Sequence, residues 1–115
     1  PTLCDLTGLP KPFHLQGNCL TPLLDGENPA WKDAVFCRWI KGETIVTKTH
    51  AYTEWYNQSG QPAHARMLFD HTKDAAENVN ISEKPENKEL VEALHQRIAK
   101  HVAEREQIQL PSGKR

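Results

Sequence analysis

Residues 34–56 read AVFCRWIKGETIVTKTHAYTEWY, and this stretch decides the fold. Three runs rich in β-branched and aromatic residues follow one another in it, at 34–40, 44–47 and 51–56, and such runs are typical of strands. Lys41-Gly42 predicts a tight turn between the first two runs. Because connections this short favour antiparallel neighbours, the stretch predicts a meander of three strands.

Two further elements follow downstream. After a polar loop at 57–65, residues 66–69 predict a short fourth strand. Pro85 then suits a first helical position, and the helix is expected to end near residues 107–108. Its apolar residues recur at helical spacing: Leu90, Val91, Leu94, Ile98 and Val102. The pattern predicts an α+β fold, a small antiparallel sheet of about four strands with one long C-terminal helix packed on it.

Residues 1–33 have a different character. Residues 1–8 (PTLCDLTG) resemble the last turns of an apolar helix, and Gly8 stands where a left-handed cap is needed. Since too few residues precede Gly8 to form such a helix alone, we expect the chain to begin inside a longer element. The remainder, up to residue 33, predicts an irregular connecting segment over a surface that other elements supply. The α+β subdomain is expected at 34–110, and a frayed tail at 111–115.

Charge and length exclude several classes of protein. The 115 residues fit one compact domain. The 14 Lys and Arg against 15 Asp and Glu leave a net charge of -1. The chain therefore lacks the excess of positive charge that favours binding to nucleic acid or to an anionic membrane surface. No apolar run approaches the ~18 residues that cross a bilayer. We therefore expect neither nucleic acid nor a membrane as a partner.

The sequence contains no catalytic or metal-binding motif. The histidines lack the spacing of a helical zinc pair, no Cys-x-x-Cys occurs, and neither a Gly-x-Ser-x-Gly elbow nor a glycine-rich phosphate loop is present. Cys4, Cys19 and Cys37 are too few for a disulfide scaffold. We expect all three to be buried as small apolar residues, although the pairing of two of them stays open.

One cluster of residues suits a ligand. Arg38, Trp39 and Lys41 stand at the end of the first predicted strand. Two cations and an aromatic ring beside a tight turn fit an anionic or sugar ligand. The same residues also fit an ordinary strand end in water, and Trp39 also fits a place in the core between sheet and helix. The residues alone leave these alternatives open.

Several stretches, in a fixed order, resemble the sequences of formylglycine-dependent sulfatases. Residues 1–10 (PTLCDLTGLP), 15–20 (LQGNCL) and 22–24 (PLL) resemble the late core of these enzymes. Residues 47–55 (TKTHAYTEW) resemble the strand pair that opens their C-terminal subdomain. The family's closing Leu-Tyr-Asp and Asp-Pro-x-Glu-x-x-Asn pattern is similar to Leu68-Phe69-Asp70, Asp74, Glu77 and Asn80. The resemblance covers nearly the whole chain and is nearest to iduronate-2-sulfatase-like members.

The chain departs from the family pattern at two single positions and at one pair of residues. Ala75 stands where proline is usual, and Cys19 replaces a common serine. His50-Ala51 stands where an acidic or basic pair is often found. Substrate contacts at that last position are therefore not carried over to this chain.

The resemblance implies an activity for the complete protein, the hydrolysis of sulfate esters of a sulfated saccharide. In the family, a Cys or Ser in a Cys/Ser-x-Pro-x-Arg motif becomes formylglycine, whose hydrated form attacks sulfur while a calcium ion polarises the sulfate. No such motif occurs here, and the calcium ligands belong to the earlier domain of the family. We therefore expect no catalytic residue, metal or cofactor in this chain, with calcium and formylglycine in a missing core domain.

The resemblance also implies a role and a partner for this chain. Residues 1–33 would be the tail end of the sulfatase core and its connecting segment, and the partner would be the larger core domain or chain. The subdomain would close one side of the active-site cleft, with Arg38, Trp39 and Lys41 contacting the substrate. The resemblance also implies a periplasmic, secreted or lysosome-like location, where enzymes of this family mostly act. The alternatives are a free-standing saccharide- or protein-binding module, and an interface piece that only covers the larger domain.

Overall fold

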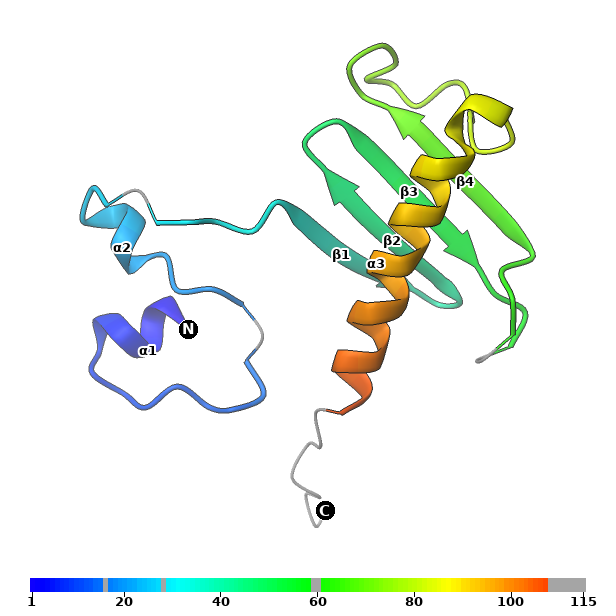
Figure 1. The fold of residues 1–115 in the computed structure, drawn as a ribbon. Coiled ribbons are helices and arrows are strands. Elements are labelled where there is room, and N and C mark those ends of the chain that lie inside the picture. Colours follow the sequence, from blue (N-terminus) through cyan, green and yellow to red (C-terminus); the bar gives the residue numbers. More distant parts are fainter. Residues whose placement is uncertain (16, 28, 59–60, 108–115) are drawn as a thin grey trace. The chain divides into compact units, whose positions relative to one another are not determined.

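The computed structural model describes residues 1–15, 17–27, 29–58 and 61–107 of the chain (Figure 1). These residues form two compact units, Pro1–Trp31 and Lys32–Gln107. The predicted tail at 111–115 and the predicted end of the subdomain at 108–110 lie outside the described residues.

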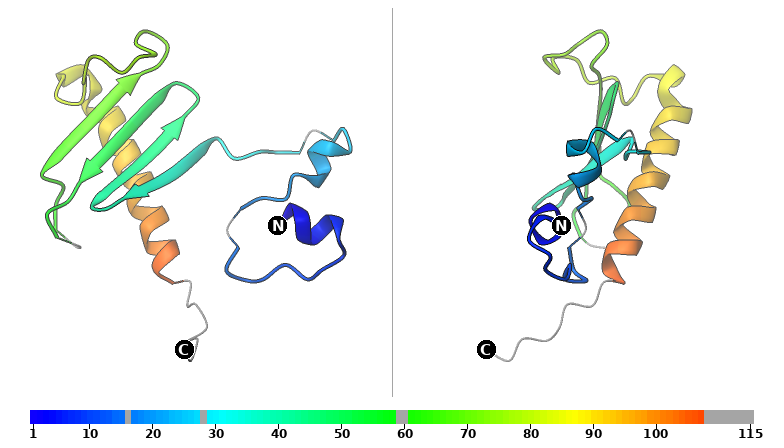
Figure 2. Two further views of the ribbon diagram at one scale, coloured as in Figure 1. Left: turned by 180° about the vertical axis from the view of Figure 1, so that it is seen from behind. Right: turned by 90° about the vertical axis from the view of Figure 1, so that its left-hand side faces the viewer.

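The larger unit is a four-stranded antiparallel sheet with one long helix. The strands are β1 (Ala34–Trp39), β2 (Gly42–Thr47), β3 (His50–Trp55) and β4 (Ala65–Asp70), and they lie in the order β1-β2-β3-β4. A 3-10 turn, η1 (Pro85–Asn87), leads into helix α3 (Lys88–Glu106). Figure 2 shows α3 lying along one face of the sheet. The predicted α+β fold is confirmed.

The core of this unit lies between α3 and the sheet. Ile45, Tyr52 and Leu68 from the middle of three strands are fully buried against Leu94 and Ile98 of the helix. The apolar stripe predicted on the helix is confirmed, since its other members pack around the same cluster. Burial of these large side chains is the main stabilising contribution to the unit.

The turn between β1 and β2 lies one residue earlier than predicted. Ile40 and Lys41 form the turn, because Trp39 already pairs with Gly42 across the two strands. Gly42 is a strand residue with a packing role: a Cβ there would lie 3.0 Å from the Trp55 ring. The turn instead places Ile40 at φ 52°, a backbone conformation that a β-branched residue adopts only with strain.

The described residues of the smaller unit form local structure without a buried core. Helices α1 (Thr2–Leu6) and α2 (Thr21–Leu24) are each followed by a glycine with positive φ, Gly8 at 67° and Gly26 at 82°. The predicted left-handed cap at Gly8 is confirmed, whereas the prediction of irregular structure missed α2. No described residue of this unit is buried, and all of its described large apolar side chains except Leu15 are exposed.

Residues 80–82 cover the outer edge of β4. The Asn80 side chain accepts from the Leu68 amide at 2.9 Å and donates to the Arg66 carbonyl at 3.0 Å. The Ile81 amide donates to the Leu68 carbonyl, and the Ser82 hydroxyl donates to Arg66. The last residue of the family's closing motif therefore satisfies the free backbone groups of an edge strand.

The expectation that all three cysteines are buried is wrong. Cys4 and Cys19 are half-buried, Cys37 is exposed, and all three are free thiols. Cys37 is exposed because its side chain points to the sheet face opposite α3. None of the described helices is long and apolar enough to span a membrane.

Candidate functional site

Charged side chains form one row across the sheet, on the face that α3 covers. The antiparallel register aligns one residue from each strand: Arg38, Glu43, Glu54 and Arg66. Two neighbouring carboxylates therefore lie in the middle of the row, partly or wholly removed from water. Such a pair requires positive charge and hydrogen-bond donors from nearby, and α3 supplies part of both.

Glu54 is fully buried, and four side chains surround its carboxylate. Tyr52 donates to Oε1 at 2.6 Å and Tyr56 donates to Oε2. His95 Nδ1 lies 2.8 Å from Oε1 and Arg66 Nε lies 3.6 Å from it. Burial alone would raise the pKa of Glu54, but the tyrosine hydroxyls and His95 outweigh it and lower the pKa. Glu54 is therefore an anion that joins α3 to β3, and burial beside it raises the pKa of both tyrosines.

Two arginines share the carboxylate of Glu43. Arg105 of α3 donates to both oxygens, with Nη2 2.8 Å from Oε1 and Nη1 3.1 Å from Oε2. This contact raises the pKa of Arg105. Arg38 approaches less closely, with Nε 3.5 Å from Oε1, and its side chain is 59% exposed. Since two cations share one anion, the three groups carry a net charge of +1.

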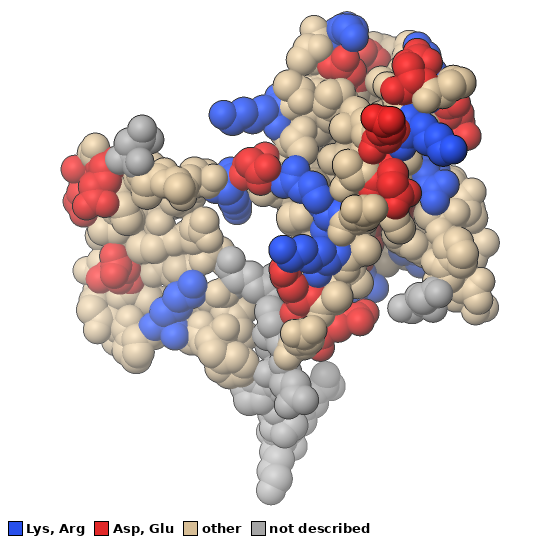
Figure 3. Space-filling model, viewed as in Figure 1, with Lys and Arg blue, Asp and Glu red and all other residues tan. Residues whose placement is uncertain are grey.

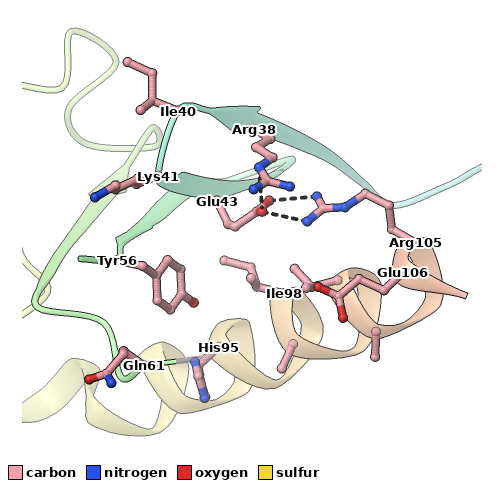
Figure 4. Close-up of a pocket in the computed structure, with 13 residues that line it drawn as sticks. Arg38, Ile40, Lys41, Glu43, Tyr56, Gln61, His95, Ile98, Arg105 and Glu106 are labelled. Atoms are coloured by element: carbon pink, nitrogen blue, oxygen red, sulfur yellow. Dashed lines mark hydrogen bonds and ion pairs between the residues drawn. The ribbon is translucent and has the colours of Figure 1, made fainter. Parts of the chain in front are cut away.

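A pocket of about 370 Å³ lies beside this group, between the β1–β2 hairpin and the C-terminal half of α3 (Figure 4). Its rim carries Arg38 and Lys41, and Ile98 and Val102 of α3 provide apolar wall. The Lys41 ammonium donates to the Asn57 carbonyl at 2.6 Å, which is a neutral partner. Positive charge beside an apolar wall suits an anionic group carried on a sugar ring.

The structure brings two of the three predicted site residues together. Arg38 and Lys41 line the pocket, but Trp39 does not. Trp39 follows Arg38 in the strand, so its side chain points to the opposite face, where it is 71% exposed. The alternative that Trp39 fills the core between sheet and helix is therefore wrong. Contact of these residues with a substrate stays a prediction.

Sequence reasoning missed four polar residues of this region: Glu43, Tyr56, His95 and Arg105. A signal for two of them was present. Residues 95, 98, 102 and 105 are three or four positions apart, so they lie on the same face of a helix. The sequence therefore placed His95 and Arg105 beside Ile98 and Val102, on the face expected to meet the sheet. A charged residue on such a face indicates a partner across the interface.

The opposite end of the sheet carries a second pocket, of about 510 Å³. Two of its carboxylates are engaged in their own turn: Asp70 accepts from the Thr72 amide at 2.9 Å, and Asp74 accepts from the Val79 amide at 2.8 Å. The Thr72 contacts lower the pKa of Asp70 to about 2. Within the described ranges, no group of three or more His, Cys, Asp or Glu could hold a metal ion.

Comparison with known proteins gives a consistent result. Residues 1–104 match the family described as N-sulphoglucosamine sulphohydrolase, C-terminal. The chain is 30% identical over 111 residues to an arylsulfatase of Clostridium perfringens (strain 13 / Type A), covering 93% of this chain and 22% of that protein.

Solved structures share the fold. A protein in complex with its substrate D-glucosamine-2-N,6-O-disulfate matches with a TM-score of 0.77 at 23% identity, over 100% of this chain and 25% of its own. The phosphonate monoester hydrolase of Agrobacterium radiobacter matches with a TM-score of 0.73 at 25% identity, over 91% and 24%. The chain therefore spans about a quarter of the length of the proteins it matches.

Proposed function

This chain belongs to the N-sulphoglucosamine sulphohydrolase C-terminal family, the C-terminal part of sulfatases, and we propose that the complete protein hydrolyses sulfate esters of a sulfated saccharide. The family match over residues 1–104 carries the proposal. The larger part of such an enzyme, about three quarters of its length, would be the partner of this chain. Calcium and formylglycine would belong to that part, where they would supply electrophilic polarisation and the nucleophile.

The proposed contribution of this chain is substrate selection at one wall of the active-site cleft. Arg38 is the residue best suited to meet a sulfate or carboxylate, because Arg105 already neutralises Glu43 and leaves much of the Arg38 charge unpaired. Lys41 adds a second cation, whose only described partner is a backbone carbonyl. Trp39 at the end of β1 offers an exposed ring for stacking on a sugar face.

The test uses the complete protein and a sulfated disaccharide. Arg38→Ala and Lys41→Ala should each raise KM about tenfold with little change in kcat, since each removes one charge contact made before and during the reaction. Arg97→Ala is the matched control, because its ion pair with Asp33 is exposed and lies outside the pocket. An unchanged KM in the first two variants would leave only the interface role for this chain.

Two further assays decide between close alternatives. The sulfatase proposal fails if the complete protein cleaves a phosphonate monoester and no sulfate ester, a possibility raised by the Agrobacterium radiobacter structure. The proposed iduronate-2-sulfatase-like subtype requires faster release of sulfate from 2-O-sulfated iduronate than from 6-O-sulfated glucosamine.

Native mass spectrometry of the protein from its own source tests the free-standing binding module. That alternative predicts a species with the mass of this chain alone. A longer or associated polypeptide carrying formylglycine would support the sulfatase proposal.

A further inference from the structure

His95 of α3 has one edge of its ring on a buried carboxylate and the rest beside the pocket. Its Nδ1 lies 2.8 Å from Oε1 and 3.0 Å from Oε2 of Glu54, which is fully buried. The side chain of His95 is nevertheless 39% exposed, and it lines the pocket of about 370 Å³, whereas Glu54 does not. The ring therefore connects the buried carboxylate to the pocket.

Other donors already serve both oxygens of Glu54. Tyr52 donates to Oε1, Tyr56 donates to Oε2, and Arg66 Nε lies 3.6 Å from Oε1. The contact with His95 is therefore additional to a set that satisfies the carboxylate. Its main structural effect is on the ring, because it fixes one ring nitrogen against a group that cannot move.

The contact with Glu54 determines which nitrogen is left for a ligand. A carboxylate only accepts hydrogen bonds, so Nδ1 of His95 carries a proton in this contact. The bond made by one ring nitrogen fixes the role of the other. Nε2 has no hydrogen-bond partner among the residues that the structure describes. In the ion pair with Glu54 the ring is protonated, so Nε2 is a second donor.

The surroundings of His95 fit an anionic group carried on a sugar ring. Arg38 and Lys41 line the same pocket, and Figure 4 shows His95 beside Tyr56 and across the pocket from Arg38. Ile98, on the next turn of α3, provides apolar wall between them. An anion in this space would receive charge-assisted hydrogen bonds from two sides.

The carboxylates that line the pocket do not oppose such a ligand at His95. Arg105 neutralises Glu43 with contacts of 2.8 and 3.1 Å. Glu106 is the last residue of α3, and at 1.5 Å per residue it lies about 16 Å along the helix axis from His95. The end of the pocket at His95 is therefore the end that favours negative charge.

We propose that His95 is a specificity-determining residue of the pocket, whose Nε2 donates to a sulfate or carboxylate of the saccharide while Glu54 positions the ring. The inference deepens the proposed function and rests on it for the identity of the ligand as a sulfated saccharide. A ring that is already held by Glu54 loses little freedom when the ligand binds, which is the physical advantage of this arrangement.

Two substitutions separate the two edges of the ring. His95→Asn keeps a donor near the position of Nδ1 and removes Nε2, whereas His95→Gln places its amide near Nε2 and loses the contact with Glu54. In the complete protein, His95→Asn should raise KM for a sulfated, uronate-containing disaccharide about tenfold with little change in kcat, and His95→Gln should stay within about threefold of the unsubstituted protein. The midpoints of thermal unfolding should show the reverse order, since His95→Gln alone removes a hydrogen bond to a buried charge.

His101→Asn is the matched control. His101 also belongs to α3, but its ring stacks on Phe36 with centroids 4.1 Å apart, and it does not line the pocket. Its substitution should leave KM unchanged.

Calorimetric titration measures binding without turnover, in the complete protein with its formylglycine precursor left unconverted. The titrants are the same disaccharide, its form without sulfate, and its form with the carboxylate reduced to an alcohol. We expect His95→Asn to weaken binding of the first about tenfold. The form whose affinity no longer responds to His95→Asn identifies the anionic group that Nε2 contacts.

Three outcomes would decide against one part of the argument. An unchanged KM and dissociation constant in His95→Asn would overturn the inference and leave His95 only as a partner of Glu54. Equal losses of binding and of stability in His95→Asn and His95→Gln would also overturn it, since binding would then follow the fold. Binding that depends on His95 in a complete protein without sulfatase activity would overturn the proposed function alone.

Discussion

Residues 1–31 and 32–107 both contain well-formed helices, but among the residues that the structure describes only those of the second region enclose a core. In the first region, two short helices end at Gly8 and Gly26, and none of its described residues is buried. In the second, α3 and the sheet bury large side chains from both sides of one interface. The difference shows that local signals such as glycine caps determine where a helix ends, whereas stability depends on apolar area removed from water.

The largest expected effect is in the core of the second region. Ile98→Ala should lower the free energy of unfolding by about 3 kcal/mol, because the side chain is 1% exposed and its removal leaves a cavity against the sheet. Urea denaturation of residues 1–115, followed by tryptophan fluorescence, measures the change.

Leu6→Ala is the control that can break the comparison. Leu6 is 59% exposed in α1, so its truncation should change the unfolding free energy by less than about 0.5 kcal/mol. A loss as large as that of Ile98→Ala would mean that the first region takes part in the same cooperative core.

A smaller effect is expected at the buried carboxylate. Glu54→Gln should destabilise the second region by about 2 kcal/mol, because two tyrosine hydroxyls and His95 lose a charged acceptor. Glu92→Gln on the outer side of α3 is the control and should be nearly neutral. Equal effects of the two substitutions would mean that the buried contacts contribute nothing.

The same carboxylate gives stability a dependence on pH. Since folding lowers the pKa of Glu54, its contribution is present above the ordinary pKa of a glutamate and is lost as the pH falls below about 4. Acid titration of unfolding should therefore be shallower in Glu54→Gln. A residual slope towards pH 2 is expected from Asp70, whose pKa of about 2 is also lowered by folding.

The smallest effect is expected at the strained turn. Ile40→Gly should raise the unfolding free energy by about 1 kcal/mol, because glycine adopts the positive φ of 52° without steric cost. Ile40→Ala is the control and should give no such gain, since alanine keeps the Cβ atom. A thermal melt that gives the same midpoint for both variants would contradict the strain.

The strands and the long helix of the second region could be predicted from the sequence, because each spans enough residues to show a characteristic pattern. Runs of β-branched and aromatic residues indicated the strands, and the spacing of Leu94, Ile98 and Val102 indicated the helix. Helix α2 escaped prediction because its four residues are too few to show a period. The turn was predicted one residue too late, at Lys41-Gly42, because glycine is common in turns. Gly42 instead lies in β2, where the ring of Trp55 leaves no room for a side chain.

The candidate site could be predicted only in part, for a reason of distance along the chain. Arg38 and Lys41 are neighbours in sequence, so their cluster was visible. The contact between Arg105 and Glu43 joins residues 62 positions apart, and no local pattern specifies such a pair. Strand alternation placed Trp39 opposite Arg38, but it does not tell which of the two faces a helix covers.

The surfaces of the two regions differ in charge as well (Figure 3). On the side shown, the second region carries many Lys, Arg, Asp and Glu side chains over α3, and the first carries few. The helix is therefore the solvated surface of its unit, which agrees with ion pairs such as Lys100–Glu104 along it.

The covered edge of β4 has a consequence for how the sheet can grow. Asn80 and its neighbours occupy the outward backbone groups of β4, whereas no strand among the described residues pairs with the outer side of β1. Any strand that joins this sheet, from a nascent chain or from a second molecule during aggregation, must therefore add at β1. The sheet can therefore be extended at one edge only. A proline introduced in β1 would prevent this addition, because it removes a backbone N–H donor there, and it would leave the covered edge of β4 unchanged.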